Sequence, residues 1–185
     1  LKEIRDALIK FKKSGKFIWS YSSMLSQSGY YLASVSDSIL IYPETIIDLR
    51  GLNMTYTFFT EALNEIGIKP EIIRSGKYKS AIEPFMLKKM SSEMREQTES
   101  LLNNIWNQIL TDISVSRDVS KNELNEIVNN ILETWGLGAK DILIDGQVYP
   151  QEISNLLKKK LNIETTLNKF GLYNEEISFV TLNDI

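Results

Sequence analysis

The stretch of sequence that decides the fold is residues 17–43, FIWSYSSMLSQSGYYLASVSDSILIYP. It begins with the aromatic and apolar run 17–21 and ends with a second apolar run, 38–42, which Pro43 stops. Short apolar runs bounded by turn residues are typical of buried strands. The small residues between the two runs favour a helix that begins near Gln27. The stretch therefore predicts a strand, a helix and a second strand.

The same unit recurs further along the chain. After a turn at Arg50-Gly51, apolar residues at helical spacing predict a helix that ends at Gly67, and residues 71–74 predict another strand. The apolar positions of this helix are Tyr56, Phe59, Leu63 and Ile66. Repeated strand-helix units at this spacing are typical of a mainly parallel sheet with covering helices. The predicted fold class is α/β.

Further helices are predicted at about 91–114, 121–133 and 151–161, the last of them behind Pro150. Leu1, Ile4, Leu8 and Phe11 also have helical spacing, and Gly15 stands where that helix would end. No capping residue precedes Leu1. We therefore expect the chain to start within a helix, at a cloning or proteolytic boundary.

Composition excludes several classes of site. The 185 residues contain no cysteine and no histidine, which removes thiolate zinc sites, disulfides, cysteine nucleophiles and Ser-His-Asp triads. A formal net charge of −3 provides no basic field for nucleic acid. Acid–base chemistry then falls to Lys, Asp, Glu or Tyr. No cofactor or metal site is expected.

The length and hydropathy favour one compact, soluble domain. A chain of 185 residues is long enough to bury one sizeable core. No apolar stretch approaches the roughly 20 residues that a bilayer-spanning helix needs, and the N-terminus lacks the pattern of a signal peptide.

Three segments resemble the signal peptide peptidase A family, also called protease IV, which is serine–lysine peptidase family S49. They are SQSGYYLAS at 26–34, SGKYKSAIEPF at 75–85, which is the most specific, and IDGQVY at 144–149. Their order and spacing agree over roughly residues 1–165. The resemblance implies a ClpP/crotonase-like fold, with 1–185 as a single half-domain in which about 115–165 form a helical closing segment.

The resemblance implies a Ser–Lys dyad with Lys79 as the general base. A lysine amine accepts a proton only when its ammonium form is disfavoured, by burial or by nearby positive charge. Lys77 supplies such charge two residues earlier, and a helix N-terminus near Lys79 would act in the same direction. The alternative from composition alone is that Lys79 is a solvated surface lysine.

The nucleophile departs from the complete family pattern. Single-domain members have a serine before Gly-Gly and an aromatic pair, and aligning on Tyr30-Tyr31 places Gln27 in that slot. A glutamine amide is not a nucleophile. Ser26 and Ser28 flank the slot, but on a helix each is rotated by about 100° and shifted by about 1.5 Å. Ser28 becomes the nucleophile only if a bulge or a different helix start rescues it; otherwise these serines are small residues for close helix packing.

This departure resembles the N-terminal half of the long, two-domain members. In those members the N-terminal half supplies the lysine and the C-terminal half supplies the serine, so the expected partner is the C-terminal half of the same protein. The family implies cleavage of remnant signal peptides and other hydrophobic peptides, a homotetramer, and a location at the bacterial inner membrane on the periplasmic side. The membrane anchor is not in this chain.

Two alternatives remain open. One is a non-catalytic scaffold for oligomerisation and groove formation, in which Lys79 is inert; a depressed Lys79 pKa would argue against it. The other is a crotonase-like acyl-CoA enzyme, which acyl-CoA binding would identify. Apolar residues such as Met54, Phe58 and Phe59 fit a peptide groove, an interface or a core.

Overall fold

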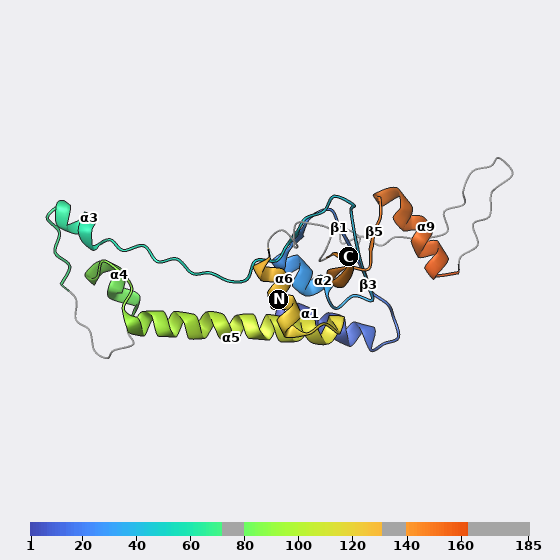
Figure 1. Cartoon of the computed structure of the whole chain (residues 1–185), viewed down its shortest axis with the longest axis horizontal. Coiled ribbons are helices and arrows are strands. Elements are labelled where there is room, and N and C mark those ends of the chain that lie inside the picture. The colour runs from blue at the N-terminus through green and yellow to red at the C-terminus, as the bar shows by residue number, and fades with distance from the viewer. Residues whose placement is uncertain (72–79, 131–139, 163–185) are drawn as a thin grey trace.

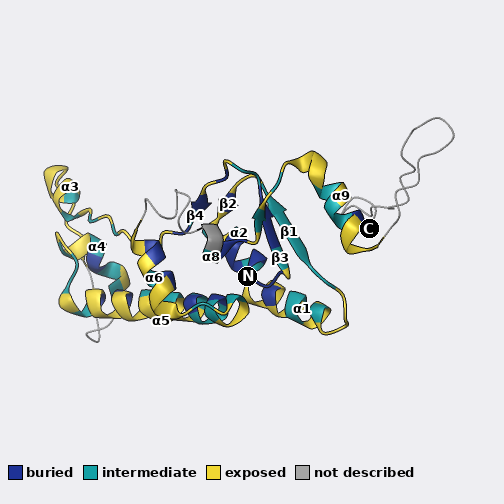
Figure 2. Ribbon diagram, turned by 45° about the vertical axis from the view of Figure 1, so that its right-hand side comes forward, coloured by how far each residue is buried: buried dark blue, intermediate teal, exposed yellow. Residues whose placement is uncertain are grey.

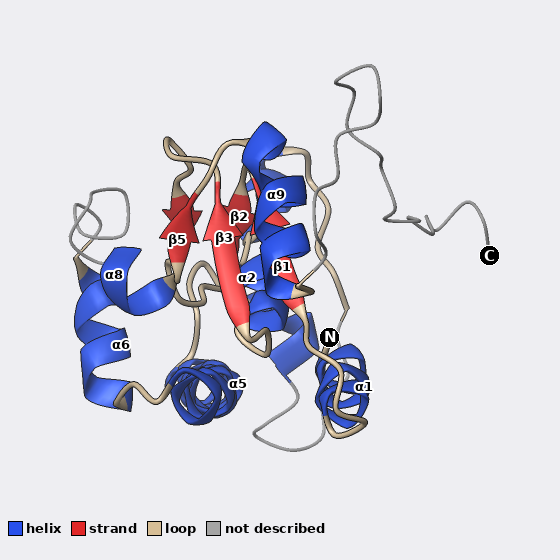
Figure 3. Cartoon of the chain, turned by 90° about the vertical axis from the view of Figure 1, so that its right-hand side faces the viewer, coloured by secondary structure: helices blue, strands red, loops and turns tan. Residues whose placement is uncertain are grey.

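The computed structural model describes residues 1–71, 80–130 and 140–162, with the side chains of 140 and 141 excepted. Its centre is a three-stranded sheet in the order β1-β3-β5 (Figure 1). A second sheet has two strands, β2 and β4. The three strand pairings among the described residues are parallel, which confirms the mainly parallel α/β fold expected from the sequence. Helices α1 and α5 lie side by side beneath the sheet (Figure 3).

The strands are short and the helices differ widely in length. The strands are β1 (Trp19–Ser22), β2 (Leu25–Ser26), β3 (Ser38–Ile41), β4 (Ile47–Asp48) and β5 (Gly146–Gln147). The helices are α1 (Lys2–Lys12), α2 (Gln27–Ala33), α3 (Thr60–Glu65), the 3-10 turn η1 (Ser80–Ile82), α4 (Glu83–Met86), α5 (Ser92–Arg117), α6 (Lys121–Asn129), α8 (Lys140–Leu143) and α9 (Pro150–Lys160). No helix in these described ranges is long and apolar enough to cross a bilayer.

The hydrophobic core gathers around α2. Tyr30 is fully buried on this helix, and it packs with residues of β3 and β4, the C-terminal part of α5, α6 and Leu143. Three serines cap helices of this core and its surroundings, because their side-chain oxygens accept a free N–H of the first turn: Ser26 for α2, Ser91 for α5 and Ser120 for α6. The core thus fixes the place where α2 begins.

An arm extends away from this core (Figure 1). We define the arm as the described residues within 52–100; it comprises an extended segment, α3, η1, α4 and the N-terminal part of α5. Most of its surface is exposed, whereas the buried residues concentrate around the sheet and α2 (Figure 2). Met94 is the buried apolar residue among those described in the arm.

The helix predicted from Tyr56 to Ile66 is shorter in the structure and begins at Thr60. Residues 52–59 form neither helix nor strand, and none of the residues of α3 is buried. A segment with helical periodicity is stable as a helix in a protein mainly when its apolar face packs against a core. Met54 and Phe59 are exposed in the arm, at 42% and 44%, so they are not core residues. The strand predicted at 71–74 falls almost entirely outside the described residues.

Candidate active site

Gln27, the residue predicted to occupy the nucleophile slot, lies at the junction of β2 and α2. Strand β2 pairs with β4 through Leu25↔Ile47 and Ser26↔Asp48, and the chain then turns into α2 at Gln27. The Ser26 hydroxyl accepts the Gly29 N–H at 3.2 Å, so it serves as the helix cap. Gln27 is therefore the first residue of the helix, which confirms the predicted helix start.

The Gln27 side chain is engaged by the backbone that follows β4. Its Oε1 accepts the N–H groups of Arg50 at 3.1 Å and Gly51 at 2.9 Å, and its Nε2 donates to the Gly51 carbonyl at 3.1 Å. These three bonds use the carbonyl group and one N–H of the amide. The slot thus holds an amide in a fixed position and presents no hydroxyl.

Ser28 lines a cavity of about 640 Å³ between α1, α2 and α5. Its side chain is exposed, and no hydrogen bond joins its hydroxyl to another described residue. Lys2 lines the same cavity, but its hydrogen bond to Asp112 at 3.1 Å raises its pKa. A lysine whose ammonium form is stabilised is a poor base. The cavity therefore holds a hydroxyl beside an unsuitable lysine.

Lys79, the predicted general base, lies outside the described residues, as does Lys77. The residues directly after it are described. The Ser80 hydroxyl donates to Gln97 Oε1 of α5 at 3.2 Å, and the buried Glu83 carboxylate accepts the hydroxyl of Ser91 at 2.7 Å and its N–H at 3.2 Å. The downstream flank of Lys79 is therefore held against the first turns of α5.

Gln27 and the described flank of Lys79 lie near different parts of α5. Ser80 contacts Gln97, whereas Gln27 and Ser28 share their cavity with Asn104. Gln97 and Asn104 are seven residues apart in one helix, which corresponds to about 10 Å along its axis. The structure brings the slot and the flank of Lys79 to the same helix but not into contact.

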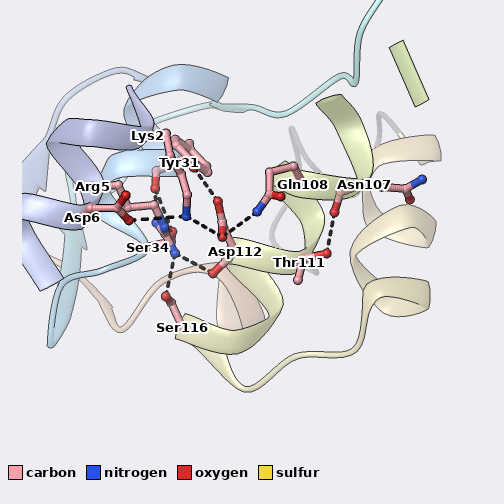
Figure 4. Close-up of polar contacts among 10 residues, drawn as sticks. All are labelled: Lys2, Arg5, Asp6, Tyr31, Ser34, Asn107, Gln108, Thr111, Asp112 and Ser116. Atoms are coloured by element: carbon pink, nitrogen blue, oxygen red, sulfur yellow. Dashed lines mark hydrogen bonds and ion pairs between the residues drawn. The ribbon is translucent and has the colours of Figure 1, made fainter. Parts of the chain in front are cut away.

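A polar cluster fixes α2 against α1 and α5 (Figure 4). Arg5 is only 1% exposed, and its guanidinium donates to the Tyr31 carbonyl, to Ser34 Oγ at 2.7 Å, to the Asp112 carbonyl at 2.5 Å and to Ser116 Oγ at 2.6 Å. The planar fork of an arginine suits such divided contacts. Three helices are therefore joined by one buried side chain.

The carboxylate of Asp112 completes this cluster. It accepts the Tyr31 hydroxyl at 2.6 Å and pairs with Lys2 at 3.1 Å. Burial disfavours its charged form, but the hydrogen bonds from Tyr31, Lys2 and Gln108 outweigh burial and hold the pKa of Asp112 below its ordinary value. Burial, together with the hydrogen bond to Asp112, raises the pKa of Tyr31 to about 12.

A second ion pair joins α5 to the segment before β5. Arg117 donates two hydrogen bonds to the Asp145 carboxylate, at 2.9 and 3.0 Å, and Asp145 also accepts the Ile39 N–H at 2.7 Å. Burial works against the charged carboxylate, but the bonds from Arg117 and Ile39 lower the pKa of Asp145 overall. This pair holds the end of α5 beside the central strand β3.

Sequence reasoning missed the roles of Arg5, Glu83 and Asp145. Arg5 sits four residues after Leu1 and three before Leu8, so its place on the apolar face was the available signal. Glu83 and Asp145 stand inside segments that resemble the family. Glu83 bonds Ser91 eight residues on, across a turn between two helices, and the partners of Asp145 are 28 and 106 residues away in the sequence. The residues that the structure does unite with the slot are Arg50 and Gly51, at the turn that the sequence predicted.

Comparison with known proteins gives one family. A model of peptidase family S49 matches residues 10–164. Protease 4 of Haemophilus influenzae is 35% identical over 121 residues, which cover 65% of this chain and 20% of that protein. The chloroplastic serine protease SPPA of Arabidopsis thaliana is 31% identical over 165 residues, 89% of this chain and 24% of the relative.

A further relative agrees. Protease 4 of Salmonella typhi is 28% identical over 178 residues, which cover 92% of this chain and 29% of the relative. The chain therefore matches between a fifth and a third of the length of these three curated relatives.

Proposed function

The chain belongs to peptidase family S49, the family of signal peptide peptidase A, and on this premise we propose that it is the lysine-bearing half of a Ser–Lys endopeptidase. Its substrates are remnant signal peptides and other hydrophobic peptides. The observation that carries the proposal is the occupant of the nucleophile slot, because Gln27 offers an amide already bonded to Arg50 and Gly51. The serine then comes from the C-terminal half of the same protein.

The proposed chemistry needs a neutral lysine at Lys79. Its Nζ takes the proton of the serine hydroxyl while the serine oxygen attacks the carbonyl carbon of the peptide bond. The ammonium then returns this proton to the leaving amine, which leaves an acyl-enzyme. Water then attacks the acyl-enzyme: Lys79 accepts a proton from the water and passes it to the departing serine oxygen, so that the acyl group leaves as a carboxylic acid and both residues regain their starting states. The scheme also requires backbone N–H groups that stabilise the oxyanion, and no particular donors are assigned to this role.

The flank of Lys79 supports this role. A general base acts only when its position relative to the nucleophile is fixed. The residues directly after Lys79 are held by the Ser80 contact to Gln97 and by the buried Glu83 carboxylate at Ser91. This part of the arm is therefore anchored to α5 even though it lies outside the hydrophobic core.

The exposed apolar residues of the arm support a partner surface. Phe59 and Phe85 stack with their ring centroids 5.7 Å apart while remaining 44% and 43% exposed. Ile66 and Ile68 are exposed at 70% and 50%. Contiguous exposed apolar surface marks interaction sites. We assign it to the C-terminal half and to the other subunits of a homotetramer on the periplasmic side of the bacterial inner membrane.

The alternative of a non-catalytic scaffold is supported by the same exposed surface. Replacing Lys79 distinguishes the scaffold from the peptidase, because a scaffold does not need the lysine amine. The match to family S49 favours a peptidase over an acyl-CoA enzyme.

A hydrophobic fluorogenic peptide tests the proposal. We expect cleavage by the longest natural chain that contains these residues and none by residues 1–185 alone. Cleavage by residues 1–185 alone, lost on Ser28→Ala, would place the nucleophile in this chain and overturn the divided site. Purified 1–185 should also bind no acyl-CoA in calorimetry.

A further inference from the structure

We propose that Gln27 is a positioning residue for the lysine half of the reaction: its amide fixes the root of the arm, in which Ser80 directly follows Lys79 in sequence. The inference rests on the function proposed above. It concerns the role of Gln27 in this half, where the slot holds an amide and not a hydroxyl.

The Gln27 side-chain amide continues the pairing of β2 with β4 beyond the point where the backbone pairing ends. β2 and β4 pair in parallel up to Ser26↔Asp48, and beyond this point the chain of β2 turns into α2. The side-chain amide of Gln27 then bonds both polar groups of Gly51 and the N–H of Arg50. An amide side chain has the same donor and acceptor groups as a peptide unit. Gln27 thus extends the pairing past the end of the strand.

Gly51 is the place where the chain leaves the core for the arm. Its φ of +85° is in the region that favours glycine, and the extended segment of the arm starts at the next residue. A Cβ at Gly51 would lie 3.8 Å from Val128 of α6, so this turn is packed under a core helix. The hydrogen bonds from Gln27 to Gly51 therefore fix the position of the first residues of the arm.

The arm is fixed at its root by two connections to the core. One is α5, whose buried Leu110 and Ile113 lie in the core and whose Asp112 is bonded by Arg5. The other is the Gln27 amide at Gly51. The outgoing segment and α5 meet again where the Tyr56 hydroxyl lies 3.1 Å from Thr98 Oγ1. Because both the outgoing segment and α5 are attached to the core, the arm is restrained against bending and twisting. Attachment through α5 alone would restrain mainly bending.

A serine in the slot would lack this function. Its oxygen is attached to Cβ, whereas the amide of glutamine is two carbon–carbon bonds further out, each of roughly 1.5 Å. A serine would therefore leave the Arg50 and Gly51 N–H groups without this partner. In this half, the residue in the slot positions the general base. In the complementary half, the serine in the equivalent slot is the nucleophile.

The test uses the longest natural chain with Gln27→Met, which keeps the length of the side chain and removes all three bonds. Active sites are counted by end-point labelling of the serine with an organophosphorus probe, and kcat is expressed per labelled site. We expect kcat per site to fall by about 10- to 100-fold, because a misplacement of about 1 Å is costly in catalysis. KM should stay within about threefold, since the amide binds no substrate in this proposal.

The matched control is Gln151→Met, an exposed glutamine at the start of α9. Both variants should melt within a few degrees of the parent chain. If kcat per site for Gln27→Met stays within twofold of the control, the positioning role is wrong. If Gln27→Met does not fold, Gln27→Glu replaces it, since its carboxylate can keep the two accepted bonds, whereas the donated bond is replaced by repulsion from the Gly51 carbonyl.

For Gln27→Glu we expect a smaller fall in kcat per site, between about two- and tenfold, and an unchanged kcat would contradict the proposal. Lys79→Ala is measured in the same assay. Full activity of Lys79→Ala would refute the proposed function itself, whatever the result at Gln27. Loss of activity at Lys79 with normal activity at Gln27 would refute only the positioning role.

Discussion

The side-chain amide of Gln27 bonds both backbone polar groups of Gly51, accepting its N–H at 2.9 Å and donating to its carbonyl at 3.1 Å. The two residues are 24 positions apart, and they connect the start of the core helix α2 with the start of the arm. Gln27, which the sequence predicts to occupy the family's nucleophile slot, is therefore a structural link in this chain.

Ser28→Ala in the longest natural chain should leave kcat and KM on a hydrophobic peptide within about twofold. The Ser28 hydroxyl has no hydrogen bond to a described residue, and the lysine in its cavity, Lys2, has its ammonium form stabilised by Asp112. Steady-state kinetics on purified protein measures the effect. A loss of a thousandfold or more with normal folding would make Ser28 the nucleophile.

Replacing Arg5 should destabilise the fold. Arg5→Met removes a buried cation with four hydrogen-bond partners, and we expect a loss of about 3 kcal/mol in the free energy of unfolding. For a domain of this size that corresponds to a fall in Tm of roughly 6–12 °C. Arg5→Lys should recover little, because one ammonium cannot reach all four acceptors.

The control for Arg5 is Lys10→Met on the exposed side of the same helix. Surface substitutions of this kind usually change stability by no more than about 0.5 kcal/mol. Urea unfolding followed by circular dichroism gives both values. Equal stability of the Arg5 and Lys10 variants would mean that the buried cluster contributes nothing to the fold.

Asp145→Asn should lower stability near neutral pH and lose that effect in acid. The folded-state pKa of Asp145 is depressed, so its contribution is present above the unfolded pKa of about 4 and disappears as pH falls through the lower folded value. At pH 7 we expect a loss of about 1.5–2 kcal/mol, a modest value because the carboxylate is 35% exposed.

Urea titrations at pH 7 and pH 3 measure this difference, with Asp118→Asn as the control. Asp118 is exposed and has a positive φ that asparagine also tolerates. The gap between Asp145→Asn and the unmodified chain should narrow at pH 3. A gap of the same size at both pH values would show that the ion pair with Arg117 is not the source of the effect.

Local patterns allowed much of the fold to be predicted from the sequence. Two apolar runs, the second ended by Pro43, predicted β1 and β3, and the spacing of Leu102, Ile105 and Ile109 agrees with α5. These elements pack against one core, so that local preference and tertiary contact agree. The start of α2 at Gln27 was predictable for the same reason.

The arm and the buried charges were harder to predict. Periodicity from Tyr56 onward indicated a helix, but residues 52–59 lie outside the core and form neither helix nor strand. Arg5 is buried because its acceptors come from residues 26 to 111 positions away, and no local pattern contains them. At the candidate site, the identity of Gln27 was readable from the sequence, whereas its bonds to Arg50 and Gly51 depend on the parallel register of β2 and β4.

The central claim is that Lys79 is the base for a serine outside this chain. The most direct measurement is kcat on a hydrophobic fluorogenic peptide for the longest natural chain, with Lys79→Ala beside Lys77→Ala as the neighbouring control. We predict that Lys79→Ala lowers kcat by at least about a thousandfold with an unchanged Tm, while Lys77→Ala keeps most of the activity. Activity of Lys79→Ala within tenfold of the unmodified chain would contradict the assignment of Lys79 as the base.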